Sequence, residues 1–182
     1  SAGDFQFAAR MVESNALDLL KNGNISTLLG WFNTLPEETI KEHPQLCVYC
    51  AWALMLAGKT DNVEKYLLPA EAHVSALKDF GGLRGDIAAV RAYAAARQGD
   101  MDQTIDKARE WLSKDNLTVR SVMAFVLGGV YYMRQDFQNA LTAMKEASEL
   151  GEQAGNINVA VSALSAVGGF QVEQGNLIEA EK

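Results

Sequence analysis

Apolar residues recur along the chain at spacings of three and four, which is the pattern of a helix that buries one face. In the clearest stretch the apolar positions are offset by 0, 3, 4, 7, 10 and 13 residues from Phe137, while Gln138, Lys145 and Glu149 fall on the opposite face. No segment alternates between apolar and polar residues for long enough to suggest a β-strand. The pattern predicts helices over 4–22, 25–34, 37–57, 60–79, 83–98, 101–113, 117–134, 137–152, 157–174 and 177–182.

A short polar motif separates the predicted helices and recurs through the sequence. Its central residues lie 35, 41, 36 and 40 positions apart. The five copies are Asn22-Gly23-Asn24, Ala57-Gly58-Lys59, Gln98-Gly99-Asp100, Arg134-Gln135-Asp136 and Gln174-Gly175-Asn176. Two-helix repeats of about 34 residues are typical of tetratricopeptide proteins, and these repeats are slightly longer.

Other positions repeat in register with these turns. Seven residues before each turn lies a small residue, as a close crossing of two helices requires: Ala16, Ala51, Ala92, Gly128 and Gly168. The positions two and five residues after each turn are mostly apolar, where a second helix would face the first: Ile25, Thr60, Met101, Phe137 and Leu177, then Leu28, Val63, Thr104, Ala140 and Ala180.

We therefore expect an all-α fold, a right-handed superhelix of four to five tetratricopeptide-like helix pairs. Residues 1–182 are expected to form a single repeat domain, a fragment of a longer protein whose last repeat is truncated. An apolar face left open at the C-terminal end would promote dimerisation or aggregation. Pro44 should interrupt the third helix, Gly81-Gly82 and Gly151 should end helices, and the longer repeats should carry loops near 79–85 and 151–156.

The charge and hydropathy of the chain narrow the classes of partner. The formal net charge is −7 and no Lys/Arg cluster offsets it, so this segment is not expected to contact nucleic acid directly. No apolar run approaches the roughly 20 residues of a membrane span. The N-terminus lacks the basic and apolar segments of a signal peptide. These features indicate a cytoplasmic protein with no membrane partner.

No residue pattern indicates catalysis, and we expect neither enzyme activity nor a metal in this segment. Residues 47–50 form a CxxC, but the βαβ context of a redox motif is missing, and a zinc site would need two further ligands, for which only His43 is nearby. Two small, buried or half-buried cysteines are the preferred interpretation. His73 stands alone on a predicted helix, and no P-loop sequence for ATP is present.

Candidate binding residues lie on the predicted first helices of the repeats. In a tetratricopeptide array these helices line a concave groove. Four aromatic and two charged residues fall where first-helix side chains would point inward: Trp52, Tyr93, Phe125, Tyr132, Arg97 and Asp86. Ordinary packing between repeats is the simpler explanation for them. The alternative is a groove that stacks a ligand on aromatic rings and holds it with one arginine.

Short motifs spread over nearly the whole chain carry a family resemblance. They are Gly3-Asp4 with Ala8-Ala9, Leu35-Pro36-Glu37-Glu38, His43-Pro44-Gln45-Leu46, Ala51-Trp52-Ala53-Leu54 with Gly58, Gly85-Asp86, Arg91-Ala92, Gly99-Asp100, Leu127-Gly128 and Gly155-Asn156. In order and spacing this set resembles the sensor region of the large ATP-dependent LuxR-family transcription activators, the MalT-like regulators. Gln135 departs from the pattern, because glycine is usual at that turn.

The resemblance implies a longer protein with a nucleotide-binding switch domain, a winged-helix linker, this sensor and a C-terminal helix-turn-helix. It implies that ATP binds the N-terminal domain and that this segment holds no cofactor. It also implies that an inducer and ATP together promote self-association of the full-length protein and transcription activation. The inducers of the family vary, so no binding residue is carried over to this chain.

Two functions remain open from the sequence. The first is a sensor that binds a small-molecule inducer and biases the protein towards an active arrangement. The second is a protein–protein interaction scaffold without a small-molecule ligand. A sensor should have an enclosed, partly apolar pocket with a few convergent polar groups, whereas a scaffold should have an open, extended groove.

Overall fold

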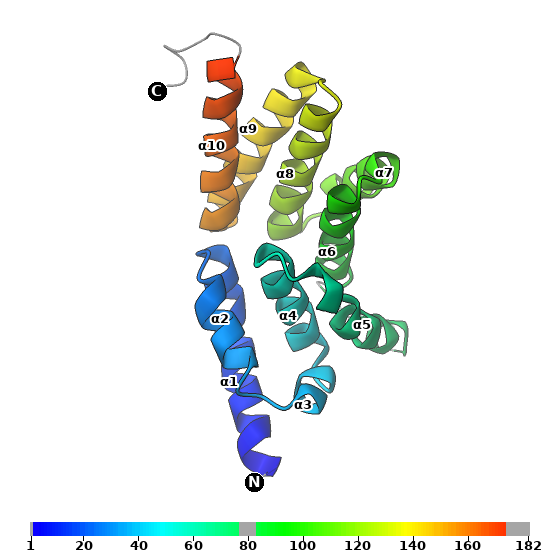
Figure 1. Cartoon of the computed structure of the whole chain (residues 1–182), viewed down its shortest axis with the longest axis vertical. Helices are drawn as coiled ribbons and strands as arrows, with labels where there is room; N and C mark the ends of the chain where they lie inside the picture. The colour runs from blue at the N-terminus through cyan, green and yellow to red at the C-terminus, as the bar shows by residue number, and fades with distance from the viewer. Residues whose placement is uncertain (1, 77–82, 174–182) are drawn as a thin grey trace. The chain divides into compact units, whose positions relative to one another are not determined.

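The computed structural model describes residues 2–76 and 83–173, and within them the chain is built from helices joined by tight turns (Figure 1). No strand occurs among these residues, so the predicted all-α class is confirmed. The elements are α1 (Ala2–Lys21), α2 (Ile25–Phe32), α3 (Glu37–Lys41), α4 (Pro44–Leu56), the short 3₁₀ helix η1 (Thr60–Asn62), α5 (Glu64–Ala76), α6 (Leu83–Gln98), α7 (Met101–Leu112), α8 (Leu117–Met133), α9 (Phe137–Gln153) and α10 (Ile157–Glu173).

The chain divides into two compact units, Ser1–Val90 and Arg91–Lys182. We call them unit 1 and unit 2. Unit 1 holds α1 to α5 and the first half of α6, and unit 2 holds the rest. The expectation of one continuous repeat domain over residues 1–182 stays a prediction.

Each described copy of the recurring polar motif forms a tight turn whose central residue has a positive φ angle, in the left-handed region. The φ angle is 73° at Gly23, 75° at Gly58, 84° at Gly99 and 61° at Gln135. Glycine adopts this conformation without strain, whereas a side chain makes it unfavourable. Gln135 is the only non-glycine residue with a positive φ in the described part of the chain. The turn register predicted from the sequence is thus confirmed at four places, and Gln174-Gly175-Asn176 lies outside the described residues.

The column of small residues lies where helices cross closely. Ala16, Ala51 and Ala92 are completely buried. A Cβ added to Gly128 would stand 2.8 Å from the Met144 side chain of α9. The column therefore has the packing cause that its position in the repeat predicts.

In unit 1 the third predicted helix, over 37–57, divides into α3 and α4. Pro44 is the first residue of α4, where a missing N–H is tolerated, and His43 before it is extended. Pro44 therefore interrupts the predicted helix, as expected. Around this break α4 packs against α1, α2 and α5, with a core of large, completely buried side chains: Leu28, Leu46, Val48 and Leu67.

Unit 2 is a layered stack in which α8 packs on α7 and α9, and α9 packs on α10. Small and large apolar residues alternate in its core, and Phe125, Tyr131 and Tyr132 pack against it from the side. The core residues are Ala124, Ala140, Met144, Ala147, Leu150, Val159, Ala163 and Phe170. Each of these helices therefore contributes apolar side chains to a core shared with its neighbours in sequence, as the repeat architecture requires.

The prediction that Gly151 ends a helix is wrong. The helix α9 continues through Gly151 to Gln153, and the chain turns at Gly155, where φ is 63°. A Cβ on Gly151 would lie 2.9 Å from the backbone nitrogen of Ala160 on α10. This glycine is needed because two helix backbones approach closely, and not because the chain turns.

The second predicted insertion, near 151–156, is also not a loop. The helix α9 has 17 residues against 12 in α7, so the added length extends a helix. The tight turn after it is stabilised by Asn156, whose side chain accepts a hydrogen bond from the N–H of Val159 at 3.3 Å. The first predicted insertion and the stop at Gly81-Gly82 fall mainly on residues 77–82, outside the described part.

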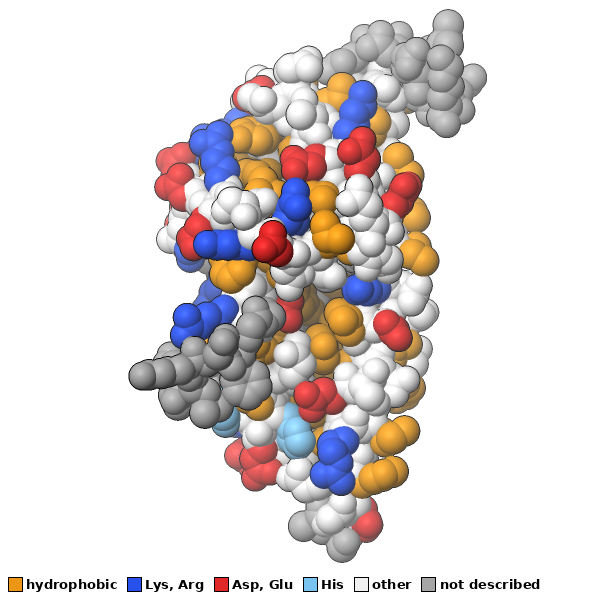
Figure 2. Space-filling model, turned by 180° about the vertical axis from the view of Figure 1, so that it is seen from behind, with side chains coloured by type: hydrophobic (Ala, Val, Ile, Leu, Met, Phe, Trp, Pro, Cys, Tyr) orange, Lys and Arg blue, Asp and Glu red, His pale blue; other side chains and the backbone are white. Residues whose placement is uncertain are grey.

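One face of α10 carries exposed apolar side chains. Their exposed fractions are 55% for Ile157, 57% for Val161, 53% for Leu164 and 50% for Val172. Their spacing of 4, 3 and 8 residues places them on one stripe, which we call the α10 stripe. Figure 2 shows hydrophobic side chains at the surface along the right-hand edge of its upper part.

The α10 stripe is expected to drive self-association of this chain at high concentration, because exposed apolar surface is removed from water on contact. Replacing Leu164 by Glu should weaken the association by at least about tenfold. Sedimentation velocity over a range of protein concentrations measures it. Leu68→Glu on α5 is the control, since Leu68 is equally exposed, at 59%, but lies outside the stripe. A wild-type chain that stays monomeric at every concentration would contradict the expectation.

Candidate functional site

Two of the predicted binding residues, Trp52 and Asp86, lie in unit 1 on first helices of their repeats. Both are half-buried. Gln45 on α4 donates a hydrogen bond from its side-chain nitrogen to Oδ2 of Asp86 on α6, at 3.2 Å. Burial raises the pKa of Asp86 from its ordinary 3.8 to about 6, against the opposing effects of the Gln45 hydrogen bond and the Lys21 charge. Asp86 is therefore a carboxylate that is held in place by α4 and only partly solvated.

The other four predicted residues, Tyr93, Arg97, Phe125 and Tyr132, lie in unit 2. Tyr132 stacks on Phe170 of α10 with ring centroids 4.5 Å apart, and meets Phe137 edge-on. Phe125 and Tyr132 both pack against the core of unit 2. Arg97 is exposed at the end of α6, and Tyr93 is half-buried. The contacts of the two α8 aromatics are those of packing side chains, and a ligand-binding role for the set stays a prediction.

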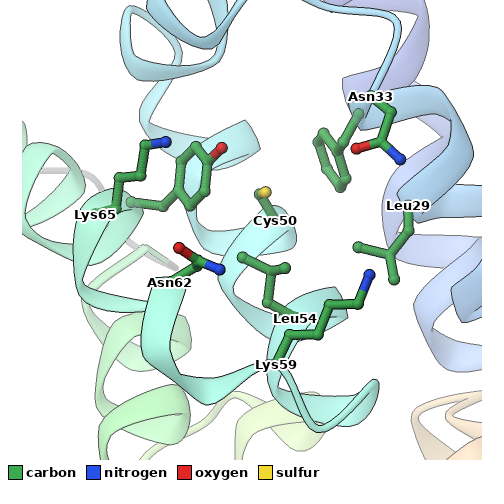
Figure 3. A pocket seen from close by; sticks show the side chains of 9 residues that line it. Leu29, Asn33, Cys50, Leu54, Lys59, Asn62 and Lys65 are labelled. Atoms are coloured by element: carbon green, nitrogen blue, oxygen red, sulfur yellow. The ribbon is translucent and has the colours of Figure 1, made fainter.

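A pocket that the sequence did not point to opens in unit 1 between α2, α4 and the η1–α5 segment (Figure 3). Its volume is about 260 Å³. The apolar part of the lining comes from Leu29 and Phe32 of α2 and from Leu54 of α4. We call it the α2–α4–α5 pocket.

Trp52 points away from this pocket although it lies between two of its lining residues. Each residue of a helix advances by about 100°, so Trp52 lies roughly opposite to Cys50 and Leu54 on α4. The pocket is therefore on the second-helix side of the repeats, and the predicted first-helix residues do not contribute to it.

Four polar side chains surround the mouth of the pocket: Asn33, Lys59, Asn62 and Lys65. Figure 3 shows Lys59 reaching from the turn after α4 towards Leu29, with the Asn62 amide directed towards Leu54. All four are exposed to solvent. Amide and ammonium groups of this kind can orient a polar group of a ligand whose apolar part lies below them.

The two lysines differ in their surroundings. Lys65 forms an ion pair with Glu37, which also pairs with Lys41 at 2.7 Å. Hydrogen bonds from Lys41 and Lys65 hold the pKa of Glu37 below its usual range. Lys59 has no acidic partner in the described part of the chain. The mouth therefore carries about one uncompensated positive charge, although the chain as a whole is acidic.

The floor of the pocket is closed by Cys50 and Tyr66, whose thiol and hydroxyl are in hydrogen-bond contact. Burial is the main cause that raises the pKa of each group to about 12. Both groups are therefore neutral at physiological pH. The floor can take part in hydrogen bonds but offers no thiolate nucleophile.

The CxxC segment is structural, as the preferred interpretation had it. Cys47 and Cys50 are buried and not disulfide-bonded, and the Cys47 thiol donates to the carbonyl oxygen of Ile40 at 3.2 Å. His43 is engaged elsewhere, with Gln6 at 2.8 Å and Glu13 at 3.3 Å. His73 is half-buried and hydrogen-bonds the carbonyl oxygen of Pro69 at 2.8 Å. No group of His, Cys, Asp and Glu in the described ranges could hold a metal ion.

Comparison with known proteins places this helix-pair architecture in a family. The model of the family described as the MalT-like TPR region matches residues 85–182, just over half of the chain. The chain belongs to this MalT-like TPR family. Tetratricopeptide domains are generally interaction scaffolds and not catalysts, so the MalT-like TPR region in hand is an interaction domain.

A solved structure has the same fold as this MalT-like TPR region. It is MamA AMB-1 C2221, which is 14% identical, with a TM-score of 0.50 and with 96% of this chain and 93% of that chain covered. At this identity the likeness concerns the fold alone. It confirms the α–α superhelical, tetratricopeptide-like class predicted from the repeat spacing.

The surface of the MalT-like TPR region carries both signs of charge. On the face displayed in Figure 2, Lys/Arg and Asp/Glu side chains are interspersed, and no large patch of one sign forms. None of the described helices combines the length and the apolar character that crossing a bilayer requires.

Proposed function

We propose that this MalT-like TPR region is the ligand-sensing and interaction domain of a LuxR-family transcription regulator, and that it takes a small molecule into the α2–α4–α5 pocket. The observation that carries the proposal is the composition of this pocket. Leu29, Phe32 and Leu54 form an apolar base, while amide and ammonium groups converge at the mouth. This combination is the one expected of a small-molecule site, and its volume of about 260 Å³ suits a ligand smaller than a drug.

The position of the pocket suggests how binding would be transmitted. Its lining joins α2 of one repeat to α4 and α5 of the next. A ligand that contacts all three helices would stabilise one packing of these two repeats over others, and the population of the protein would move towards that packing. In a full-length regulator with the nucleotide-binding and helix-turn-helix domains that the resemblance implies, such a shift would control self-association and transcription activation.

A thermal-shift screen of this chain tests the proposal, because a ligand that binds only the folded state raises the Tm. The compounds are sugars, nucleotides, amino acids, aromatic metabolites and small organic acids. We expect one chemical class to stabilise the wild type and to lose its effect on Asn62→Trp, which blocks the pocket mouth from an exposed position.

Two further variants, Arg97→Ala and Tyr132→Ala, test whether a compound binds the first-helix face instead of the pocket. A compound whose effect disappears in these variants but not in Asn62→Trp would place the ligand outside the pocket. Absence of any stabilising compound would contradict ligand sensing by this chain.

The second candidate is a protein–protein scaffold without a small ligand, and the α10 stripe favours it. Exposed Ile157, Val161 and Leu164 offer the row of apolar anchors that a partner helix would use. A protein partner captured by the wild type and lost on Leu164→Glu, together with an empty ligand screen, would establish the scaffold function.

A further inference from the structure

We infer that the α2–α4–α5 pocket selects a small organic acid, a single carboxylate carried on a short apolar group. The inference deepens the proposed function and rests on it. The charge at the mouth, the apolar base and the amide groups each limit the chemistry of the ligand in a different way.

The positive charge at the mouth favours a ligand that carries one negative charge. Lys59 has no acidic partner in the described ranges, whereas the charges of Lys41 and Lys65 are offset by those of Glu37 and Glu38. None of the residues that line the pocket is Asp or Glu. A cationic ligand would therefore meet repulsion at the mouth, whereas a carboxylate would gain a charge-assisted hydrogen bond from the Lys59 ammonium.

The apolar base of the pocket favours a ligand with a hydrocarbon group. Phe32 and Leu54 are buried at 4% and 9% exposure, and Leu29 beside them is half-buried. A sugar or a free phosphate would leave this surface without apolar contact and would bring hydroxyl or oxygen groups that find few partners there. A branched or aromatic group of a few carbons fits within about 260 Å³ and adds van der Waals contacts with Leu29, Phe32 and Leu54.

The amide groups favour a ligand that places hydrogen-bond acceptors at the mouth. The side chains of Asn33 and Asn62 form no hydrogen bond within the described part of the chain, and both line the pocket. Figure 3 shows that they come from opposite walls, Asn33 from α2 and Asn62 from the η1 side. Their NH₂ groups can donate to the carboxylate oxygens that the Lys59 ammonium does not reach.

The same chemistry has two possible sources, a free organic acid and the C-terminal carboxylate of a peptide that ends in an apolar residue. The probes are isocaproate for the free acid, and a short peptide ending in leucine for the protein terminus. Each is paired with its neutral amide, which has the same shape without the charge.

The test measures affinity by NMR titration of the leucine methyl groups, with the Tm measured in parallel. Isocaproate should bind, and isocaproamide should bind at least about tenfold more weakly, because the charge-assisted hydrogen bond is lost. Lys59→Gln should weaken isocaproate binding by about tenfold and leave isocaproamide unchanged. Lys114→Gln, an exposed lysine of unit 2, is the charge-matched control and should leave both affinities as they are.

Each of the other outcomes refutes one part of the inference about the pocket. Equal binding of acid and amide by the wild type would make the site an apolar one and refute the carboxylate, without any need for a variant. Tighter binding of the peptide acid than of isocaproate would assign the pocket to a protein terminus. Stabilisation by another class in the screen, with no effect of acids, would refute this inference and keep the proposed function. No binding by any class would refute both.

Discussion

Replacing Asp86 by Asn is expected to raise the free energy of unfolding by up to about 3 kcal/mol near pH 7.5. Burial raises the pKa of this carboxyl from 3.8 to about 6, so above about pH 6 the folded protein holds an ionised group that is more stable in the unfolded chain. Asn keeps an oxygen that can accept the Gln45 hydrogen bond but has no charge. The figure is an upper limit, because a carboxylate in the first turn of α6 also interacts favourably with the helix dipole.

The sign of this effect gives it a characteristic pH dependence. As the pH falls through about 6, the folded state binds a proton before the unfolded state does, and the disadvantage of wild-type Asp86 disappears by about pH 4. Urea unfolding near pH 7.5 and near pH 4 should therefore separate wild type and Asp86→Asn only at the higher value. Asp106→Asn, at an exposed site on α7, should show no such difference. An equal effect of Asp86→Asn at both pH values would refute a raised pKa.

Replacing Gly151 by Ala is expected to lower the free energy of unfolding by about 2 kcal/mol, although alanine is the better helix former. The added Cβ would lie 2.9 Å from the nitrogen and 3.1 Å from the Cα of Ala160. Because these are backbone atoms and not the end of a flexible side chain, α9 and α10 must move apart to accept it. Their shared core around Leu150 and Ala163 would be loosened.

The matched control for this prediction is Gly129→Ala on α8. No atom lies within 4 Å of a Cβ at that position, so only the gain in helix propensity remains, and stability should rise by about 1 kcal/mol. Urea unfolding of the two variants should thus give changes of opposite sign. A stabilising effect of both substitutions would mean that the close contact between α9 and α10 is absent.

Much of the fold follows from the sequence because its determinants are local. A turn that needs a left-handed residue recruits glycine, and a close helix crossing recruits a small residue, so the columns around Gly58 and Ala51 repeat visibly along the chain. The prediction of a helix end at Gly151 failed for the same reason. The sequence contains a glycine in either case, and only the position of Ala160 on the next helix distinguishes a close contact from a helix end.

The candidate site was much harder to predict. The lining of the α2–α4–α5 pocket comes from three helices, and its residues share no periodic pattern or motif. Lys59 and Asn62 have the polar composition of any turn, and what is unusual is only that Lys59 has no acidic partner within the described residues. The aromatic residues Phe125 and Tyr132 were the stronger signal in the sequence, yet in unit 2 they pack against a core. Ligand recognition therefore depends on non-local side-chain placement that periodicity does not encode.

The burial of the two cysteines makes them a natural probe of motion. They are the only cysteines in the sequence, both lie on α4, and burial raises the pKa of each to about 12. Cys47 does not line the α2–α4–α5 pocket, so a thiol reagent can react with it only when the helices around α4 separate, and the rate of its alkylation reports the free energy of that opening. Because unit 2 contains no cysteine, alkylation of the native chain measures the local opening of unit 1 and is unaffected by local opening of unit 2.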